Sequence, residues 1–365
     1  MLNSLQNSKY LCILITSMKL SKGLGDFFGL DIGTNAIRVV QLSKTSNGWN
    51  LAHYGYAPVD SRITTSDSAE SRRKLGEVIM TAVGQSGIKT SNVAIGLPSS
   101  KSFTTIVDVP KVSEQELRAT MKYQVDQYIP MAIDEAKVDW ALLGDSAKSQ
   151  SQYEILLSST AKSYAEERLE LVESLGLNVI AEEPDTIAMV RSLMAIGAQD
   201  AHLILDIGEN STDLAVVYGD APRLVRTIPT GIGSLVRSAV QNLNVQDAQA
   251  KQFILKFGLA PDRLDGQVLK AIDGVLDNFT AEIIKSIKFF QTRYPNLSVK
   301  SIYLSGFGAV IPQIDAYVAA KTNISTQAAS PWQRVSMSTE ARQQLAPVAA
   351  EFAAAVGLAQ RSNLA

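Results

Sequence analysis

The sequence has very little cysteine and histidine, the residues that form disulfides and most often hold zinc. It contains one cysteine, Cys12, and two histidines, His53 and His202, among 365 residues. A single cysteine cannot form a disulfide within the chain, which fits a reducing compartment. Neither histidine stands in a spacing typical of metal ligands, so the sequence argues against a zinc site. We interpret both histidines as ordinary strand-end or surface residues.

The sequence also lacks an excess of charge of one sign. Its 34 basic and 36 acidic residues give a formal net charge of −2, so nothing indicates nonspecific binding to nucleic acid. Hydrophobic residues make up 46% of the chain and charged residues 19%, which fits a soluble globular protein with a sizeable core. At the usual ~100–200 residues per domain, the length suffices for two or three domains.

The N-terminus has an apolar run that is too short to span a membrane. The run extends from Tyr10 to Thr16, whereas a spanning helix needs about 20 residues. One lysine precedes the run and no small-residue cleavage site follows it, so it is a weak signal-peptide candidate. Met18 offers a second start for the chain. We therefore exclude residues 1–17 from the fold and expect residues 1–26 to form a disordered extension.

Hydrophobic periodicity predicts an α/β chain with an insertion in its first half. The residues favour a strand, a turn and a second strand over 27–42, further strands at 49–59 and 92–100, and a helix over 68–87. Residues 100–182 are expected to form an inserted β-α-β-β-α-β module. Its first helix begins with a capping box of Ser113 and Glu116.

One apolar stripe on that first helix has two interpretations. We interpret it as the core face of the inserted module, and a groove for a partner is the alternative. The stripe comprises Leu117, Met121, Val125 and Tyr128.

The second half of the chain repeats the strand-turn-strand pattern over residues 201–219. A strand at 222–231 and a helix at 232–243 follow, then a mainly helical region over 244–298, and a strand with a glycine turn over 299–310. The predicted domains are a first lobe (1A) at 27–99 and 183–200, an inserted module (1C) at 100–182, a second lobe (2A) at 201–240 and 299–345, and a helical subdomain (2B) at 241–298. An alanine-rich helix near 346–361 is expected to return to the first lobe.

One acidic motif occurs twice in the sequence. Asp31 lies in "LDIGTN" and Asp206 lies in "LDIGEN", each at the end of an apolar strand and before a glycine turn. A lone aspartate there usually accepts hydrogen bonds from backbone N–H groups, which is the structural alternative. Two copies in similar β-rich units indicate related half-domains that face one another. Their turns would present N–H groups, hydroxyls and two acids to one ligand across a cleft.

Phosphate together with a divalent cation fits the chemistry of these turns. Glycine lets the backbone approach phosphate oxygens, and hydroxyl and amide side chains in both turns add hydrogen-bond donors. Mg²⁺ prefers one or two carboxylates plus phosphate, so Asp31 and Asp206 would hold it through water. Arg38 would neutralise phosphate charge. The later turn "SGFG" at 305–308 would take a phosphate or the adenosine side of a nucleotide, and the sequence has no GxxxxGK[ST] P-loop.

The order of these motifs resembles the actin, sugar kinase and chaperone ATPase superfamily. More narrowly, residues 27–360 resemble the family of type IV pilus assembly protein PilM, a relative of the division protein FtsA. The insertion between the halves of the first domain is the arrangement of these two relatives. The resemblance rests on "LDIGTNAIRVVQL", "YIP" at 128–130, "GLNVIAEEP", "LDIGENSTDL", "TGIG", "EIIKSIKFF", "YLSGFGAVIP" and "AAVGLA".

The resemblance implies an α/β, actin-like (ribonuclease H-like) fold of two lobes, with ATP and Mg²⁺ in the cleft. Slow ATP hydrolysis at most is expected, with Asp206 and Asp31 as catalytic candidates and as Mg²⁺ ligands through water. Lys251 is a candidate for the nucleoside contact. The implied nucleotide-binding residues are Asp31, Gly33, Thr34, Asn35 and Arg38 in the first loop, Asp206, Gly208, Asn210, Ser211, Thr212 and Asp213 in the second, then Gly231 and Gly233, and finally Gly306, Phe307 and Gly308.

The resemblance also implies a role and partners. A PilM-like protein is expected to be a cytoplasmic scaffold, peripheral at the inner membrane through the N-terminal tail of a PilN-like protein. That tail is expected in a groove between the first domain and the inserted module. Pilus motor ATPases and self-association into a ring are further expected partners, and nucleic acid is not one.

Two other functions compete with the scaffold. An FtsA-like membrane tether normally ends in an amphipathic helix, and this chain ends in "GLAQRSNLA". A small-molecule kinase needs a catalytic base at a substrate hydroxyl, such as Asp206 or Asp213. No separate substrate-binding constellation accompanies these aspartates, so the scaffold is favoured.

Overall fold

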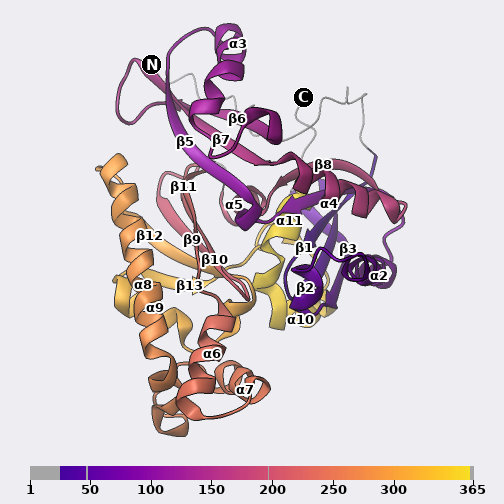
Figure 1. Cartoon of the computed structure of the whole chain (residues 1–365), viewed down its shortest axis with the longest axis vertical. Coiled ribbons are helices and arrows are strands. Elements are labelled where there is room, and N and C mark those ends of the chain that lie inside the picture. The colour runs from indigo at the N-terminus through magenta and orange to yellow at the C-terminus, as the bar shows by residue number, and fades with distance from the viewer. Residues whose placement is uncertain (1–24, 47, 196, 362–365) are drawn as a thin grey trace. The chain divides into compact units, whose positions relative to one another are not determined.

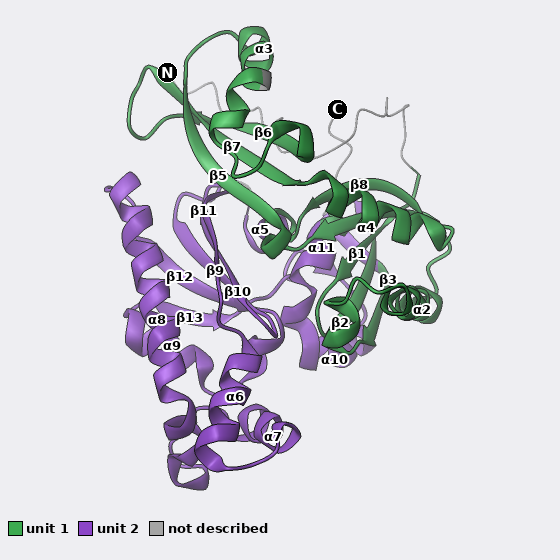
Figure 2. Ribbon diagram, in the orientation of Figure 1, with its two compact units in different colours: residues 1–43, 52–188, 358–365 green, residues 44–51, 189–357 purple. Residues whose placement is uncertain are grey.

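The computed structural model describes residues 25–46, 48–195 and 197–361, which form two α/β units (Figures 1 and 2). Unit 1 contains the residues up to 43, residues 52–188 and those from 358. Unit 2 contains residues 44–51 and 189–357. The expectations for residues 1–24 lie outside the described residues.

Unit 1 is built on a mixed sheet in the order β3-β2-β1-β4-β8. The strands β1, β2 and β3 form an antiparallel meander, while β4 and β8 run parallel to β1. At the start of β3, Trp49 and Asn50, which belong to unit 2, pair with the short strand β14 of the same unit. The bounds are β1 Phe28–Ile32, β2 Ala36–Thr45, β3 Gly48–Pro58, β4 Asn92–Leu97, β8 Asn178–Pro184 and β14 Val335–Ser336.

Alternating side chains give this sheet two different faces. One face carries large apolar residues such as Leu30 and Ile95, which pack against α2 (Ala69–Ser86) and α4 (Lys162–Ser174). The other face carries small residues, Ala94 and Ala181, which pack with Ala188 and Leu358. Small side chains let a helix approach the sheet closely, so the alanine-rich end of the chain fits here.

The inserted residues form a small antiparallel sheet in the order β5-β7-β6. Its core contains Leu117, Met121 and Val125 of the predicted stripe, with Tyr128 packed beside them. The capping box of Ser113 and Glu116 is present. The last strand of the expected module, β8, pairs with β4 and so belongs to the main sheet. The bounds are β5 Ser102–Pro110, α3 Glu114–Gln124, β6 Ala136–Asp145 and β7 Gln152–Ala161.

Unit 2 has a sheet in the order β11-β10-β9-β12-β13. The strands β9, β10 and β11 again form a meander, and β12 and β13 again run parallel to the first strand. This is the strand order of unit 1, with β9 in the place of β1 and β12 in the place of β4. The bounds are β9 Ala201–Ile207, β10 Thr212–Tyr218, β11 Ala221–Ile228, β12 Val299–Ser305 and β13 Ser325–Ala328.

Helices cover both faces of the second sheet. One face packs against α6, α7, α8 and α9 around residues such as Leu205, Phe279 and Phe290. The other packs against the end of α5 and the start of α11. The bounds are α5 Asp185–Leu193, α6 Ile232–Leu243, α7 Asp247–Phe257, α8 Gln267–Arg293, α9 Ile314–Thr322, α10 Thr339–Leu345 and α11 Ala353–Ala359. A membrane-spanning helix, long and apolar enough to cross, is not found in the described parts of the chain.

Candidate functional site

The first repeated aspartate is buried in an ion pair at the base of its turn. Asp31 of β1 lies opposite Arg38 of β2, and Arg38 Nη1 is 3.0 Å from Asp31 Oδ2. Both side chains are less than a tenth exposed. Arg38 also stacks over the ring of Tyr56, with 5.6 Å between the guanidinium carbon and the ring centre. The two side chains that were expected to serve cation and phosphate separately thus contact each other in this structure.

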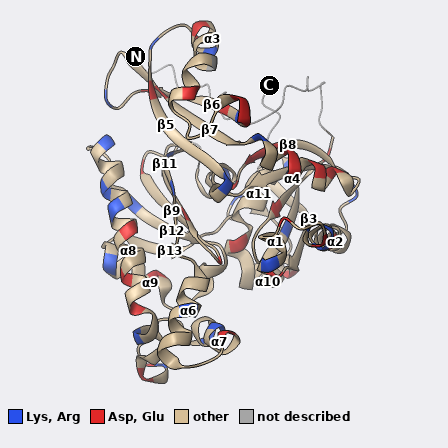
Figure 3. Cartoon of the chain, in the orientation of Figure 1, with Lys and Arg blue, Asp and Glu red and all other residues tan. Residues whose placement is uncertain are grey.

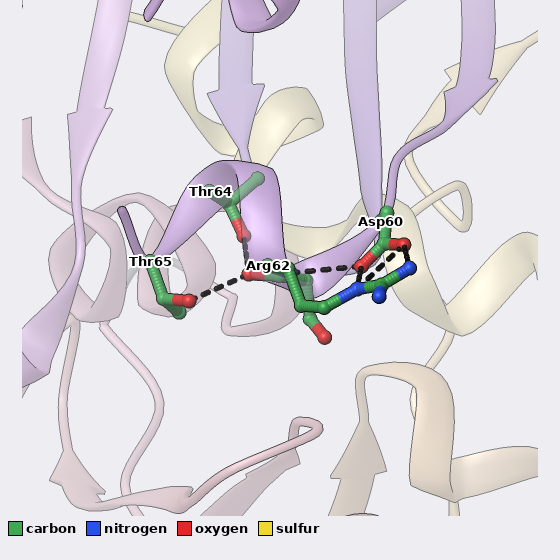
Figure 4. A network of polar contacts seen from close by, with 5 residues as sticks. Asp60, Arg62, Thr64 and Thr65 are labelled. Atoms are coloured by element: carbon green, nitrogen blue, oxygen red, sulfur yellow. Dashed lines mark hydrogen bonds and ion pairs between the residues drawn. The ribbon is translucent and has the colours of Figure 1, made fainter. Parts of the chain in front are cut away.

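The turn after Asp31 is held from the side by α1 (Ser61–Thr64) and by Val59, two residues before this helix. Val59 N donates to Asn35 O at 2.9 Å, and Thr64 Oγ1 donates to Thr34 O at 3.1 Å. Figure 4 shows how Asp60 caps α1 by accepting from the backbone and the side chain of Arg62. These bonds to Arg62 lower the pKa of Asp60 to about 2. Residues outside the sheet therefore hold two backbone carbonyl groups of the turn by hydrogen bonds.

The second repeated aspartate lies near the end of β9, before a turn that hydrogen bonds hold in place. Asp206 of β9 lies opposite Asp213 of β10, and Gly208 N donates to Ser211 O at 2.9 Å. Asp213 Oδ1 accepts from Thr227 Oγ1 at 2.8 Å. The buried Thr212 donates its hydroxyl to Thr230 O at 2.7 Å. Asp213 thus ties the turn to β11, and Thr212 ties it to the residues that follow β11.

The start of α6 supports the same turn. Ile232 N donates to Gly208 O at 3.0 Å, and Gly233 N donates to Glu209 O at 2.8 Å. The N–H groups at a helix start have no partner within the helix, and here two of them hold the turn. A Cβ at Gly231 would lie 2.6 Å from Glu209 O, so only glycine permits this approach. Gly231 and Gly233 therefore position the second turn.

The glycine turn after β12 packs directly on the end of β9. Gly306 has φ +76°, and a Cβ there would lie 2.8 Å from both Asp206 Oδ1 and Ile207 O. A Cβ at Gly308 would lie 2.2 Å from Ile207 Cγ2. The sequence "SGFG" thus places glycine where a backbone must touch the second aspartate. Phe307 lies between these glycines and begins a short 3₁₀ helix, Phe307–Val310.

A lysine from α7 completes the cluster in unit 2. Lys251 Nζ is 3.0 Å from Glu209 Oε2 and 5.3 Å from the centre of the Phe307 ring. Sequence reasoning selected Lys251 and Phe307 but missed Glu209. Its only signal in the sequence was its place in the turn between Gly208 and Asn210, because 42 residues separate it from Lys251.

Unit 2 therefore brings together segments that are far apart in the sequence. The β9–β10 turn, the start of α6, Lys251 of α7 and the turn after β12 meet around Asp206. The first turn, with Asp31 and Arg38, is a separate element of unit 1. Among the residues that the structure describes, no group of three or more His, Cys, Asp or Glu side chains is arranged to hold a metal.

Comparison with known proteins shows which family the chain belongs to. The sequence model of the family described as type IV pilus assembly protein PilM matches residues 29–363. The chain belongs to this PilM family. The resemblance that the motifs indicated is thereby confirmed, and a role in type IV pilus assembly is the family's description.

Solved structures agree on the fold. The structure of a PilM–PilN type IV pilus biogenesis complex matches with a TM-score of 0.77 and 22% identity, covering 92% of this chain and 98% of that one. Ethanolamine utilization protein EutJ from Carboxydothermus hydrogenoformans matches with a TM-score of 0.54 and 15% identity, covering 93% and 91%. The PilM-family chain thus has the expected α/β, actin-like fold.

Proposed function

We propose that this PilM-family protein is an ATP-binding scaffold that docks the N-terminal tail of a PilN-like protein. The observation that carries the nucleotide part is the cluster in unit 2. Glycines, a lysine, an aromatic ring and an aspartate from four separate segments converge there on one turn. Core packing alone does not require Lys251 to lie over Phe307 beside a half-buried aspartate.

The residues of this cluster suit a nucleotide with its magnesium ion. Asp206 supplies a carboxylate for Mg²⁺ through water, since Mg²⁺ takes few protein ligands when phosphate is present. The turn after Asp206 supplies N–H groups and hydroxyls for phosphate, and Lys251 and Phe307 suit the nucleoside. In unit 1, the turn with Asp31, Gly33, Thr34 and Asn35 offers a carboxylate and hydrogen-bond donors of the same kind. Bound ATP would supply a phosphoryl group for slow hydrolysis at most.

The partner site that we propose is a groove in unit 1. It lies between α2 and α4, has a volume of about 570 Å³, and is called the α2–α4 groove below. Although α4 lies within residues 100–182, it packs beside α2 on the main sheet, so this groove lies between two helices that cover the same face of that sheet. Apolar side chains in a groove favour an amphipathic peptide segment. Its lining includes Arg72, Gly76, Met80, Glu167, Leu171 and Leu175.

A titration of Mg²⁺-ATP into the purified protein tests the nucleotide part. We expect saturable binding that Asp206→Ala weakens at least about tenfold, which is about 1.4 kcal/mol. The matched control is Asp220→Ala, because Asp220 is exposed in the next turn of the same unit. No binding by the folded wild-type protein, or equal affinity of both variants, would contradict this part.

Fluorescence anisotropy with a labelled PilN-like tail peptide tests the docking part. We expect Met80→Glu to weaken binding about tenfold or more, because Met80 lines the α2–α4 groove and is 40% exposed. Gln85→Glu is the control, since Gln85 is exposed on the same helix and lies outside the groove. If both variants bind like the wild type, the tail docks elsewhere.

Docking of that tail would also determine where in the cell the protein lies. A scaffold bound to the cytoplasmic end of an inner-membrane protein is peripheral at the inner membrane. Contacts with the pilus motor ATPases, and ring formation by several copies, would follow from the same assembly. Co-sedimentation with membranes that contain or lack the PilN-like partner tests this placement, because binding to both membranes alike would exclude the tail as the anchor.

A further inference from the structure

We propose that Glu209 obstructs the nucleotide site of unit 2 by holding Lys251, and that Arg237 becomes the partner of Glu209 when a nucleotide binds. This switch belongs to the proposed nucleotide site, and so it rests on the nucleotide part of the proposed function. Three features of unit 2 carry it: the ion pair of Glu209, the start of α6 beside that pair, and the space that Gly233 leaves between Glu209 and Arg237.

The ion pair places a carboxylate in the turn that is proposed to bind phosphate. Lys251 Nζ lies 3.0 Å from Glu209 Oε2, which is a hydrogen-bond distance. The side chain of Glu209 is only 15% exposed, so solvent screens its charge less than it would at the surface. A phosphate group at this turn would meet a charge of its own sign, and Lys251 cannot contact the nucleotide while Glu209 holds it. The pair therefore opposes binding until the Glu209 side chain moves.

Glu209 also lies beside the positive end of α6. The N-terminus of a helix carries a partial positive charge that attracts anions. Glu209 Oε1 lies 3.7 Å from the position that a Cβ on Gly233 would take, in the first turn of α6. One carboxylate thus neutralises both the ammonium group of Lys251 and the helix start. A phosphate group that enters the turn competes with Glu209 for both.

The backbone of Glu209 is fixed independently of its carboxylate. Gly233 N donates to Glu209 O at 2.8 Å, and a Cβ on Gly231 would lie 2.6 Å from the same oxygen. These contacts hold the peptide group and do not involve the end of the side chain. A change of rotamer can therefore move the carboxylate while the turn keeps its shape.

Arg237 lies where the released carboxylate can reach it. Arg237 Nη1 lies 3.4 Å from the same Cβ position on Gly233 that Glu209 Oε1 approaches. The nearest atom to that position is Glu209 O at 3.1 Å, so the absent side chain leaves a space between the two groups. Arg237 Nη2 donates to Ser234 Oγ at 3.1 Å, which holds the guanidinium near the start of α6. The basic residues of α6 and α7 are blue in Figure 3.

The two cations give Glu209 one partner in each state of the site. Without a ligand, Glu209 pairs with Lys251. When a nucleotide binds, the carboxylate moves past Gly233 toward Arg237, and Lys251 turns to the ligand. A charge that leaves water and loses its partner is costly, so Arg237 lowers the cost of opening. Nucleotide binds more weakly than the turn and Lys251 alone would permit, and Arg237 limits this loss.

Titration of Mg²⁺-ATP into purified variants tests the obstruction by Glu209. Glu209→Gln removes the charge and keeps the length of the side chain. We expect it to tighten binding about fivefold, because Lys251 no longer pairs with a carboxylate. The control is Asp220→Asn, which removes the same charge from an exposed turn of the same unit and should change the affinity less than about twofold. Equal affinity of Glu209→Gln and the wild type would overturn the proposal, and so would weaker binding, which would make Glu209 a direct ligand.

The same titration tests Arg237 as the second partner of Glu209. Arg237→Gln should weaken binding about threefold in the wild type, because the released carboxylate then has no cation beside it. In the Glu209→Gln background, Arg237→Gln should leave the affinity unchanged, since Arg237 acts through Glu209. The double-mutant cycle measures this difference. Equal weakening in both backgrounds would show that Arg237 contacts the nucleotide itself, and would overturn its role in the switch.

The outcomes separate this switch from the proposed function. If the wild type binds Mg²⁺-ATP and neither Glu209→Gln nor Arg237→Gln changes the affinity, the switch fails while nucleotide binding stands. If no variant binds Mg²⁺-ATP although circular dichroism shows that all are folded, the nucleotide function fails and the switch fails with it. Tighter binding by Glu209→Gln, together with loss of the Arg237 effect in that background, is the result expected of the switch.

Discussion

At the scale of single residues, the buried pair of Arg38 and Asp31 constrains the first turn most strongly. A guanidinium and a carboxylate that are both less than a tenth exposed are costly to separate, because the remaining charge stays out of water. The contact joins neighbouring strands across the hairpin, and Arg38 Nη1 also faces the position of Gly33. The pair therefore holds the turn whether or not it also serves a ligand.

We predict that Arg38→Met lowers the free energy of unfolding by about 3–5 kcal/mol, because it removes the guanidinium from a buried carboxylate. The double variant Asp31→Asn with Arg38→Met should lose less than Arg38→Met alone. Urea denaturation of the single and double variants measures both. A double variant that loses as much as the sum of two single variants would show that the two residues do not interact.

Gly306 is the second residue with a defined conformational role. Gly306→Ala should lower the free energy of unfolding by about 1–3 kcal/mol, because its φ of +76° and the nearby Asp206 oppose a side chain. Gly274→Ala is the control, since Gly274 lies within α8 with nothing within 4 Å of a Cβ. It should raise stability by about 0.5–1 kcal/mol. Denaturation curves with the same sign for both variants would contradict the assignment.

His202 is expected to make stability depend on pH. Burial lowers the pKa of His202, and Asp200 opposes this in part. The unfolded chain therefore binds the proton more readily, so stability from this group is full above the ordinary pKa of about 6.5 and falls as pH falls through the lowered folded value. The free energy of unfolding should drop less in His202→Gln than in the wild type between about pH 7.5 and about pH 5.5. Parallel urea titrations measure both drops, and identical drops would rule out His202.

At the scale of elements, local patterns in the sequence predict most helices and strands. The helix expected at 232–243 is α6, and the capping box of Ser113 and Glu116 starts α3. These elements depend on nearby residues, whose periodicity and capping are visible in the sequence. The place of β8 was not visible, because its pairing with β4 joins residues about 86 apart, as in the bond from Asn178 to Asn92.

In the candidate site, too, the features formed by neighbouring residues could be predicted, and those formed by distant residues could not. Each aspartate and glycine turn could be predicted, since each is a short motif at the end of an apolar strand. The pairing of Lys251 with Glu209 could not, because it depends on how α7 lies beside the β9–β10 turn. The use of the α6 N–H groups to hold that turn was also unpredicted, because a helix start after glycine equally suits an anion.

The inserted sheet offers an element-scale test on one helix. Met121→Ala in α3 should cost about 2–5 kcal/mol, because Met121 is fully buried against the β5-β7-β6 sheet. Tyr123→Ala should change stability by less than about 0.5 kcal/mol, since Tyr123 is 80% exposed. Hydrogen exchange of the β5, β6 and β7 amides measures the local loss. Equal protection in both variants would contradict the interpretation of the stripe as core.

At the scale of the whole molecule, the chain uses one strand order twice. In both sheets a meander of antiparallel strands is followed by a parallel strand beside its first member. The two aspartates stand at equivalent points, each opposite a charged residue of the next strand. This equivalence supports the internal repeat inferred from "LDIG" and explains why two turns have similar chemistry.

Nucleotide and partner binding should be coupled if both proposals hold. The phosphate-binding turns that we propose belong to both units, whereas the α2–α4 groove belongs to unit 1. A coupling free energy of about 1–3 kcal/mol would change tail affinity by about 5- to 150-fold on addition of Mg²⁺-ATP. Anisotropy titrations with and without nucleotide measure this ratio. Equal tail affinity under both conditions would exclude coupling.

The route of the chain has a consequence for its synthesis. Unit 1 begins the chain and also receives its last described residues, with Leu358 packed among Ala94, Ala181 and Ala188. Arg361 is 2.8 Å from the buried Glu183, again within unit 1. A ribosome that has made all of unit 2 still holds the residues that complete unit 1. The first unit to be translated is therefore the last to be finished, and stalled or truncated chains should be targets for quality-control proteases.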